Sequence, residues 1–542
     1  LLSTRSVPEC ITEAKMEPQS RTALLDSRLV VGDQKLFRKL RDRFRKDCIE
    51  KDKTRFFEER SLDINTRHAK WSHTVFLQEP NIKESPGTLR DYHNLDWIID
   101  AEAGTRSMTE LVRKRILTRH ARRELKDAFN FLHRVRNALH YHDKGNDILT
   151  LRFQGIIANE FSYPHKTILR RIEVFMREYY THARSVHNHT RSIFEIFELQ
   201  HKEEGHTSIR SRLTFGLIKK KPKTLDDYTL QNERLSARRK DIFEENPNRL
   251  IRLFVYCQKY QVTPSPSLRK LIKKSWDLID RSFRVRRENR EAFREILERK
   301  GQVATTLRLM HRCGVLGRYL PEFGALDCLV QHEFFHRYTA DEHTLRCIDQ
   351  LDALVENDDP KVSIYRDIIV KHPDPYALYI ALILHDTGRA ENVREHVDGS
   401  AILAARLCKR LQITGGRRAL IMFLVDHHLT LWRFATKKNI DDPEVIEEFA
   451  ELMRDRHRLD ALLLFTFADS NGTNEEAWSP WKESLILQLY KNTRSFLVET
   501  ETSRIKIHAA EFEEVCAEVK ATLKEKYHAT FDEHCSLMAK RY

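Results

Sequence analysis

The sequence predicts a mainly α-helical protein, and two kinds of pattern support this prediction. Apolar runs at residues 377–384, 419–425 and 461–468 have the length of buried helices and are far too short to cross a membrane. Elsewhere the apolar residues recur at helical spacing, over residues 36–48, through 100–205 and on to about 300. The last forty residues show the same pattern on a face formed by Phe512, Cys516, Val519 and Leu523.

Length and composition favour a soluble globular chain. With 542 residues there is room for about three or four domains. Charged residues make up 32% and hydrophobic residues 41%, and we find no signal peptide and no apolar run near membrane length. Nine scattered cysteines without a Cys-x-x-Cys pair argue against a disulfide framework or a zinc–cysteine site. We therefore expect a cytoplasmic protein with reduced thiols and no membrane attachment.

The net charge of +14, from 94 Lys and Arg against 80 Asp and Glu, suits an anionic partner such as a nucleotide, RNA or an acidic protein. The charge is dispersed and few aromatic residues are interleaved with it, so specific nucleic-acid binding is the less favoured interpretation. One face of the helix expected after Asp33 carries Lys35, Lys39, Arg43 and Lys46. We interpret this face as solvated, with a triphosphate or a partner protein as the alternative.

The apolar run 377–384 ends directly in His385-Asp386, and Thr387-Gly388 follows as a helix stop. A His and an Asp at the end of a buried helix are well placed to hold a metal ion. A second pair, His142-Asp143, provides an internal comparison. It stands in a turn-like stretch with no apolar run before it, and we expect a solvated loop there.

Ligand-type residues recur at three other expected helix ends. Thr339 and Glu342 have the spacing of a capping box, so a helix is expected to begin at Thr339 with His343 in its first turn. The run 419–425 is followed by Asp426-His427-His428, and the run 461–468 ends in Asp469. A polar cap in water explains any one of these ends. All of them together favour a metal site.

His343, His385-Asp386 and Asp469, in this order on helices, resemble the H…HD…D pattern of the HD-superfamily metal-dependent phosphohydrolases. The words FFHRYTADEHTL, ALILHDTGR, VDHHL, FAD and WSPWKESLILQLY resemble one family more closely, the bifunctional PII uridylyltransferase/uridylyl-removing enzymes of bacterial nitrogen control. The stretch 79–91 is similar to the EPN-K-E-GP-GGLRD segment at the end of that family's nucleotidyltransferase domain, with Thr88 in place of the second Gly.

This resemblance implies four parts. They are a remnant of an α/β nucleotidyltransferase domain over residues 1–100, a helical linker domain over 101–304, an all-α HD domain over 305–495 and a C-terminal helix over 496–542. The family's Gly-Ser turn and Asp-x-Asp pair are not found in the first hundred residues, so we expect no transferase activity, and Glu84 and Asp91 cannot replace the pair. We also expect no glutamine response, because the family's glutamine-sensing ACT domains would follow the last residues.

The resemblance implies hydrolysis of a uridylyl-tyrosine phosphodiester on PII, with release of UMP. It assigns His343, His385, Asp386 and Asp469 as metal ligands, with His396 and His427 as further ligands. Catalytic roles fall to His385, Asp386 and Arg389, and substrate-binding roles to Arg389 and His428, although the sequence does not separate His427 from His428. We expect a divalent metal, Mn²⁺ or Mg²⁺ first, with Fe²⁺, Co²⁺ or Zn²⁺ also compatible with imidazole and carboxylate ligands. The implied partners are PII and the uridine nucleotides UMP and UTP.

The sequence departs from the family pattern near the expected site. Arg389 stands where the family usually has Lys, residues 393–396 read Val-Arg-Glu-His instead of Gly-Gly-Asp-His, and the residues after Asp469 lack the usual basic side chain. Two other interpretations therefore stay open. One is a non-catalytic regulatory piece that binds PII, and the other is a different HD-type nucleotide phosphohydrolase, against which the stretch 79–91 argues.

Overall fold

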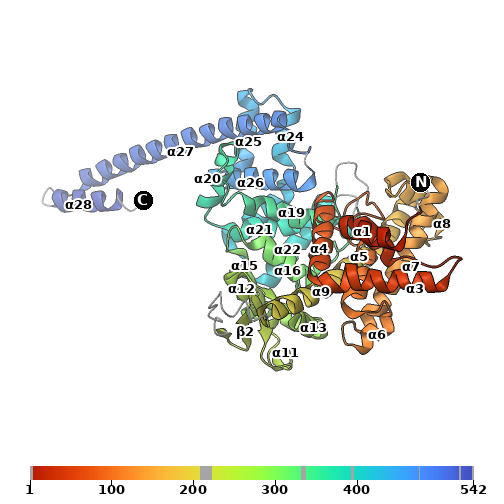
Figure 1. Cartoon of the computed structure of the whole chain (residues 1–542). Helices are drawn as coiled ribbons and strands as arrows, with labels where there is room; N and C mark the ends of the chain where they lie inside the picture. The colour runs from red at the N-terminus through yellow and green to blue at the C-terminus, as the bar shows by residue number, and fades with distance from the viewer. Residues whose placement is uncertain are drawn as a thin grey trace. The chain divides into compact units, whose positions relative to one another are not determined.

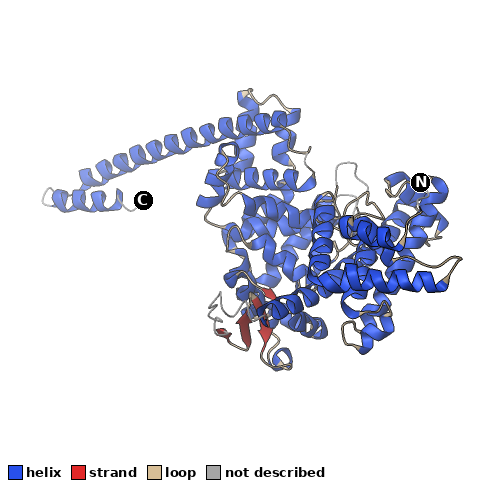
Figure 2. Ribbon diagram, viewed as in Figure 1, coloured by secondary structure: helices blue, strands red, loops and turns tan. Residues whose placement is uncertain are grey.

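The structure is a computed structural model that describes residues 4–207, 223–330, 337–391, 396–474, 476–523 and 527–539. Helices dominate, and the described strands form one small sheet, which confirms the predicted mainly α fold (Figures 1 and 2). The chain forms two compact units. The first comprises Leu1–Ile296, Gln302–Arg346 and Arg389–Arg394, and the second comprises Leu297–Gly301, Cys347–Gly388 and Glu395–Tyr542.

The first part of the first unit is a helical core. Its helices are α1 (Val7–Met16), α2 (Pro18–Leu25), α3 (Gln34–Phe44), the π-helical η1 (Arg45–Ile49), η2 (Glu50–Asp52), α4 (Lys53–Ala69), α5 (Leu89–Ala103), α6 (Met108–Arg113), α7 (Arg119–His142), α8 (Leu151–Glu160) and α9 (Ile168–Thr207). In α7 the buried positions follow helical spacing from Ala121 to Leu139, and α7, α5 and α8 all pack against α9. Residues 4–103 form only helices and two isolated bridge pairs at Leu77 and Asn81.

The rest of the first unit begins with a small mixed sheet. The strands β1 (Lys223–Leu225), β2 (Tyr228–Gln231), β3 (Arg234–Ala237) and β4 (Thr263–Pro264) lie in this order, antiparallel except for the parallel pair β3–β4. The helices are α11 (Ile242–Glu245), α12 (Arg249–Tyr260), α13 (Pro266–Lys274), η3 (Trp276–Leu278), α14 (Arg281–Val285), α15 (Arg287–Leu297), α16 (Val303–Arg312), α17 (Leu316–Tyr319), α18 (Pro321–Gly324) and α19 (Ala340–Ala353). Helix α19 is continuous, and its residues from Cys347 onward belong to the second unit.

The second unit is helical throughout its described residues. Its elements are η4 (Pro360–Val362), α20 (Ser363–Lys371), α21 (Pro375–Leu384), η5 (Thr387–Glu391), α22 (His396–Leu411), α23 (Gly415–His427), α24 (Thr430–Lys437), α25 (Pro443–Met453), α26 (Arg456–Thr473), α27 (Pro480–Thr522) and α28 (His528–Ala539). Residues 376–384 of α21 are all buried, because α22, α23 and α26 surround this helix. The predicted apolar helix before His385 is confirmed. The expected boundary at residue 496 lies inside α27.

Three local predictions need correction. Helix α19 begins next to Thr339 as expected, but no capping box forms, because Glu342 pairs with Arg308 and Arg346 while the Thr339 N–H donates to the Phe76 carbonyl. Asp143 lies in the turn after α7, as expected for a loop, but His142 does not. His142 is the last residue of α7, and it is exposed and paired with Glu160.

The third correction concerns Asp469, which does not end its helix. Helix α26 continues to Thr473, and in its last turn the side chains of Asn471 and Thr473 donate to the carbonyls of Phe467 and Asp469. Ser-Asn-Gly after an apolar run is therefore the last helical turn here and not a stop signal. As a result, Asp469 projects from the side of a helix and not from a flexible end.

Asp91 joins α4, α5 and the loop 79–88. This fully buried carboxylate accepts from Arg67 at 2.5 Å and from the Gly87 N–H at 2.6 Å, and its oxygens lie 3.0 Å from His68 Nε2. Gly87 has φ +77°, and a Cβ there would come within 2.1 Å of the Ala183 carbonyl oxygen, so only glycine fits. Burial opposes the ionised form, but the hydrogen bond from His68 and the charge of Arg67 lower the pKa of Asp91 to about 2.

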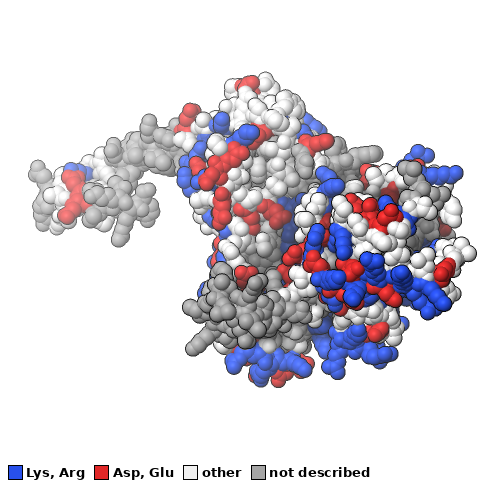
Figure 3. Space-filling view, in the orientation of Figure 1, with Lys and Arg blue, Asp and Glu red and all other residues white. Residues whose placement is uncertain are grey.

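Basic side chains gather along α3 on one face of the first unit (Figure 3). Lys35, Lys39, Arg43 and Lys46 all lie here and are wholly or partly exposed, as the sequence predicts. In the part of the chain that the structure describes, we find no helix with the length and apolar character needed to span a membrane.

We predict that Asp91→Asn lowers the free energy of unfolding by about 3 kcal/mol at neutral pH, because the buried Arg67 loses its counter-charge. The folded-state pKa lies below the unfolded value, so the contribution of Asp91 is complete at neutral pH and is lost as the pH falls toward about 2. Urea unfolding at neutral and acidic pH measures both effects. The exposed Asp42→Asn on α3 is the control, and equal losses in the two variants would contradict the prediction.

Candidate metal centre

Several helices bring ligand-type side chains to one point. Helix α19 carries His343 and, one turn later, Cys347; His385 and Asp386 follow α21; and Asp469 lies on α26. One donor atom from each of His343, Cys347, His385 and Asp469 lies within 4.8 Å of the others. The three residues other than Asp469 are buried, and Asp469 is partly buried. Residues more than a hundred positions apart in the chain thus share one small volume.

His385 is oriented by a backbone hydrogen bond. Its Nδ1 lies 2.8 Å from the Leu382 carbonyl oxygen, so Nδ1–H donates to that oxygen and Nε2 faces two carboxylates. Nε2 lies 3.4 Å from Asp386 Oδ2 and 3.4 Å from Asp469 Oδ1. A histidine that binds a metal typically donates its second N–H to a carbonyl or carboxylate in this way.

The electric field of this site favours a positive charge. Burial alone would lower the pKa of His385, but the carboxylates of Asp386 and Asp469 outweigh the effect of burial and raise the pKa to about 9. A field that holds a proton on an imidazole also attracts a cation placed between the same groups. Imidazole nitrogens and carboxylate oxygens form a donor set that fits Mn²⁺, Fe²⁺, Co²⁺ or Zn²⁺.

Cys347 is the residue of this group that the sequence analysis missed. Its thiol lies 4.0 Å from the backbone carbonyl oxygen of Asp469, and burial together with the two carboxylates raises the pKa of the thiol well above its usual range. A neutral thiol packs between the helices but is a poor metal ligand. The sequence feature that could have identified Cys347 is its spacing of four residues from His343, which puts both side chains on one face of α19.

The structure separates His427 from His428. The ring of His428 is buried 5.6 Å from the ring of His385, and its Nδ1 lies 2.8 Å from the Val425 carbonyl oxygen, which repeats the arrangement of His385. The ring of His427 instead lies 4.8 Å from the ring of Phe423 and contacts Thr430. Burial and the nearby His385 lower the pKa of His428 despite the two carboxylates.

Two other predicted site residues are located less fully. Arg389 lies in η5, shortly after Asp386, and is partly buried. His396 is the first residue of α22, and its side chain lies outside the described part of the structure. Two hydrogen bonds hold the turn that follows α21. Thr387 Oγ1 donates to the Leu384 carbonyl, and the Gly388 N–H donates to Ser400 Oγ.

Gly472 lets α26 pack closely against α19. A Cβ at this position would stand 2.6 Å from Cys347 Sγ and 2.8 Å from the Cys347 backbone nitrogen, which is closer than atoms can approach. One helical turn earlier on α26 is Asp469, and Phe465, a further turn back, lies against the rings of His385 and His428. The absence of a side chain at Gly472 therefore sets how near Asp469 can come to α19.

We predict that Gly472→Ala destabilises the protein by about 1–3 kcal/mol, because the added methyl group forces α26 away from α19. The same displacement moves Asp469 from His385 and should weaken the binding of Mn²⁺ at least tenfold. Urea unfolding and titration with Mn²⁺ measure the two effects. The control is Gly416→Ala in α23, where an added Cβ meets nothing within 4 Å, and it should leave both quantities nearly unchanged. Equal behaviour of the two variants would contradict this account of the helix contact.

Comparison with known proteins provides independent evidence about this chain. Residues 55–194 match the family model described as GlnD PII-uridylyltransferase, and residues 228–319 match the model of the uridylyltransferase GlnD third domain. Neither matched region reaches His343, His385 or Asp469. The chain is also 31% identical over 502 residues to a bifunctional uridylyltransferase/uridylyl-removing enzyme of Bradyrhizobium sp. (strain ORS 278).

That alignment covers 91% of this chain and 54% of the relative, so the chain spans about half the length of the curated relative it matches. The two family models and the relative agree with one another. Together they place the chain in the GlnD-like uridylyltransferase/uridylyl-removing enzyme family.

Proposed function

We propose that this chain is a metal-dependent phosphodiesterase that removes UMP from the uridylylated tyrosine of PII. The observation that carries the proposal is the convergence of His343, His385 and Asp469, with Asp386 beside them, in the H…HD…D order of the HD-superfamily hydrolases. The family placement supplies the substrate, because it concerns proteins described as uridylyltransferase and uridylyl-removing enzymes.

The proposed ligands are His343, His385, Asp386 and Asp469. When bound, a divalent metal would polarise the phosphoryl group and make hydroxide available near neutral pH. The side chains have separate tasks in this scheme. Asp386 and Asp469 supply the negative charge that balances the cation, and the Leu382 carbonyl keeps Nε2 of His385 turned toward them. The family resemblance also suggests His396 and His427 as further ligands.

In the reaction, the oxygen of water bonds to phosphorus, the bond between phosphorus and the tyrosine oxygen breaks, and the tyrosine oxygen takes up a proton. We assign Arg389 and His428 to the substrate phosphate. The guanidinium of Arg389 offers a planar pair of donors where the family usually has a single lysine ammonium. His428 is the better placed of the two adjacent histidines, because its buried ring lies against that of His385.

We predict that Asp386→Asn removes most of the bound metal and lowers the rate of UMP release by at least about 100-fold, since even residues that only orient metal ligands act on this scale. The substitution keeps the size of the side chain and removes the charge that balances a divalent cation. Mass spectrometry measures the metal content, and release of UMP from uridylylated PII with added Mn²⁺ measures the activity.

The matched control is Asp143→Asn in the other His-Asp pair, at the end of α7. Asp143 accepts from the Asn146 side-chain amide at 2.9 Å, which an asparagine oxygen also does, so neither metal content nor activity should change. Retention of metal and activity in Asp386→Asn would overturn the enzyme proposal. A metal-free, inactive wild type that still binds PII would favour a regulatory binding role, and hydrolysis of free nucleotides instead of uridylylated PII would favour another HD-type phosphohydrolase.

A second prediction tests the choice between the adjacent histidines. His428→Ala should lower the rate of UMP release by about tenfold or more, because it removes a ring that lies against His385 in the same buried space. His427→Ala should have a smaller effect, since that ring lies on Phe423. The rates of both variants with uridylylated PII decide the matter, and a larger loss in His427→Ala would reverse the assignment.

A further inference from the structure

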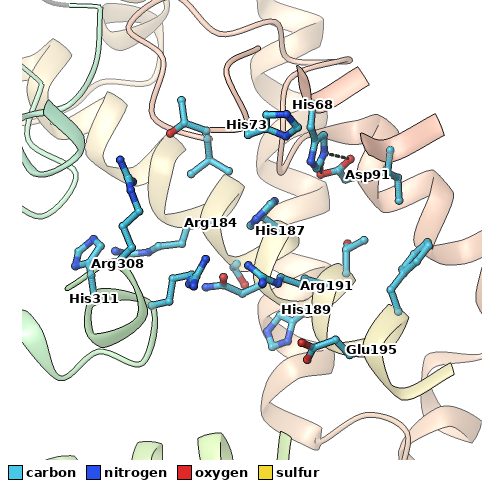
Figure 4. Close-up of a pocket in the computed structure, with 18 of the residues that line it drawn as sticks. His68, His73, Asp91, Arg184, His187, His189, Arg191, Glu195, Arg308 and His311 are labelled. Atoms are coloured by element: carbon cyan, nitrogen blue, oxygen red, sulfur yellow. Dashed lines mark hydrogen bonds and ion pairs between the residues drawn. The ribbon is translucent and has the colours of Figure 1, made fainter. Parts of the chain in front are cut away.

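The first unit contains a large cavity that the proposed function does not use. Its volume is about 1780 Å³, and α4, α9, α16 and the turns before α17 and after α18 line it. Figure 4 shows Arg184, His187 and Arg191 of α9 with Arg308 and His311 of α16 around this space. The volume far exceeds that of a single small ion, so the cavity has room for a metabolite.

Most carboxylates on the cavity wall are neutralised by neighbouring cations or imidazoles. The pairs are Asp91 with Arg67, Glu124 with His189, Glu195 with Arg234 and Arg269, Asp327 with Arg184, and Glu342 with Arg308. These contacts are within the first unit, and Glu58, Asp127 and Glu198 also line the cavity. The contacts also fix the arginines that take part in them, which are therefore not available to a ligand.

Among the described residues of the wall, three arginines have no carboxylate partner, and one of them, Arg318, is held by the Gly314 carbonyl and the Trp276 ring. Arg191 and Arg312 are the other two. Among the residues that the structure describes, no carboxylate lies within the 4.0 Å ion-pair distance of Arg191 or Arg312, and both side chains are exposed to the space of the cavity. Removal from bulk water and the charge of Arg191 lower the pKa of Arg312 to about 10. Two like charges from α9 and α16, 121 positions apart in the chain, therefore line one cavity without an ion-pair partner among the described residues.

His187 lies on α9 one turn before Arg191 and also lines the cavity. Burial is the main reason that the pKa of His187 is lowered to about 4, and His68, Arg191 and Arg312 lower it further. The charge of Asp91 acts in the opposite direction. The imidazole is therefore neutral at physiological pH and can offer a hydrogen bond without adding charge. His68, Asp91 and His187 lie within 4.8 Å of one another, but Asp91 is already saturated by Arg67, His68 and Gly87, which argues against a metal there.

We propose that this cavity is a binding site for a phosphate-bearing small molecule, whose phosphate group lies between Arg191 and Arg312. A guanidinium presents a planar fork of N–H donors that matches phosphate oxygens. Two unmatched positive charges are balanced by a dianion, which favours a phosphate group over a single carboxylate. The remaining volume of the cavity accommodates the rest of such a molecule.

The experiment titrates the full chain with inorganic phosphate in the presence of a chelator, so that binding at the proposed metal centre cannot contribute. Calorimetry and the melting temperature are both recorded. Wild type should bind phosphate and melt at a higher temperature with it, and acetate at equal ionic strength should have no effect. Arg191→Gln and Arg312→Gln should each weaken phosphate binding at least tenfold, whereas the exposed Arg28→Gln should bind like wild type.

A purely structural role for Arg312 makes a different prediction. If Arg312 only stabilises the fold, Arg312→Gln lowers the melting temperature in phosphate-free buffer. If Arg312 serves to bind an anion, Arg312→Gln removes its repulsion from Arg191. The variant then melts at the same or a higher temperature than wild type and no longer responds to phosphate. Arg312→Lys keeps the positive charge but loses the planar pair of N–H donors, so it should bind phosphate with intermediate affinity. An equal response to acetate, or undiminished phosphate binding in both glutamine variants, would overturn the proposal.

Discussion

The ion pairs of His385 with Asp386 and Asp469 constrain how α21 and α26 meet in the second unit. Both partners of His385 lie at 3.4 Å from its Nε2, in a region that is otherwise formed by apolar helices. Burying charges costs several kcal/mol per ion unless the geometry between them is good. The positions of α21 and α26 relative to each other must therefore be set closely.

The cost of burying charge also distinguishes the cluster proposed as a metal site from one that is neutralised within the fold. His68, Asp91 and His187 come as near to one another as the residues around His385 do, yet Asp91 has a permanent cation in Arg67 and a backbone donor in Gly87. The carboxylates beside His385 instead raise its pKa to about 9, which is the sign of a site with excess negative charge. The presence of His and Asp is common to both clusters, and only the balance of charge separates them.

The two units contain opposite imbalances of charge. In the second unit, two carboxylates meet one imidazole, and we propose that a cation completes the balance. In the first unit, Arg191 and Arg312 line the same cavity, and the proposed anion completes the balance there. Both imbalances are tolerated because rigid helices hold the groups, and each identifies the charge of the ligand that its site is suited to bind.

The sequence alone determined where the main buried helices lie, but not every residue that ends them. Apolar runs predicted α21, α23 and the core of α26, because a helix buried on all sides needs no polar face, and the spacing of Thr339 and Glu342 located the start of α19. Tertiary structure decided which side chains meet. Packing turned His428 and not His427 toward His385, added Cys347 beside them, extended α26 past Asp469, and brought Arg191 and Arg312 to one cavity. Periodicity along the chain is a local property, whereas the charge facing a side chain depends on distant helices and on close contacts such as that of Gly472 with Cys347.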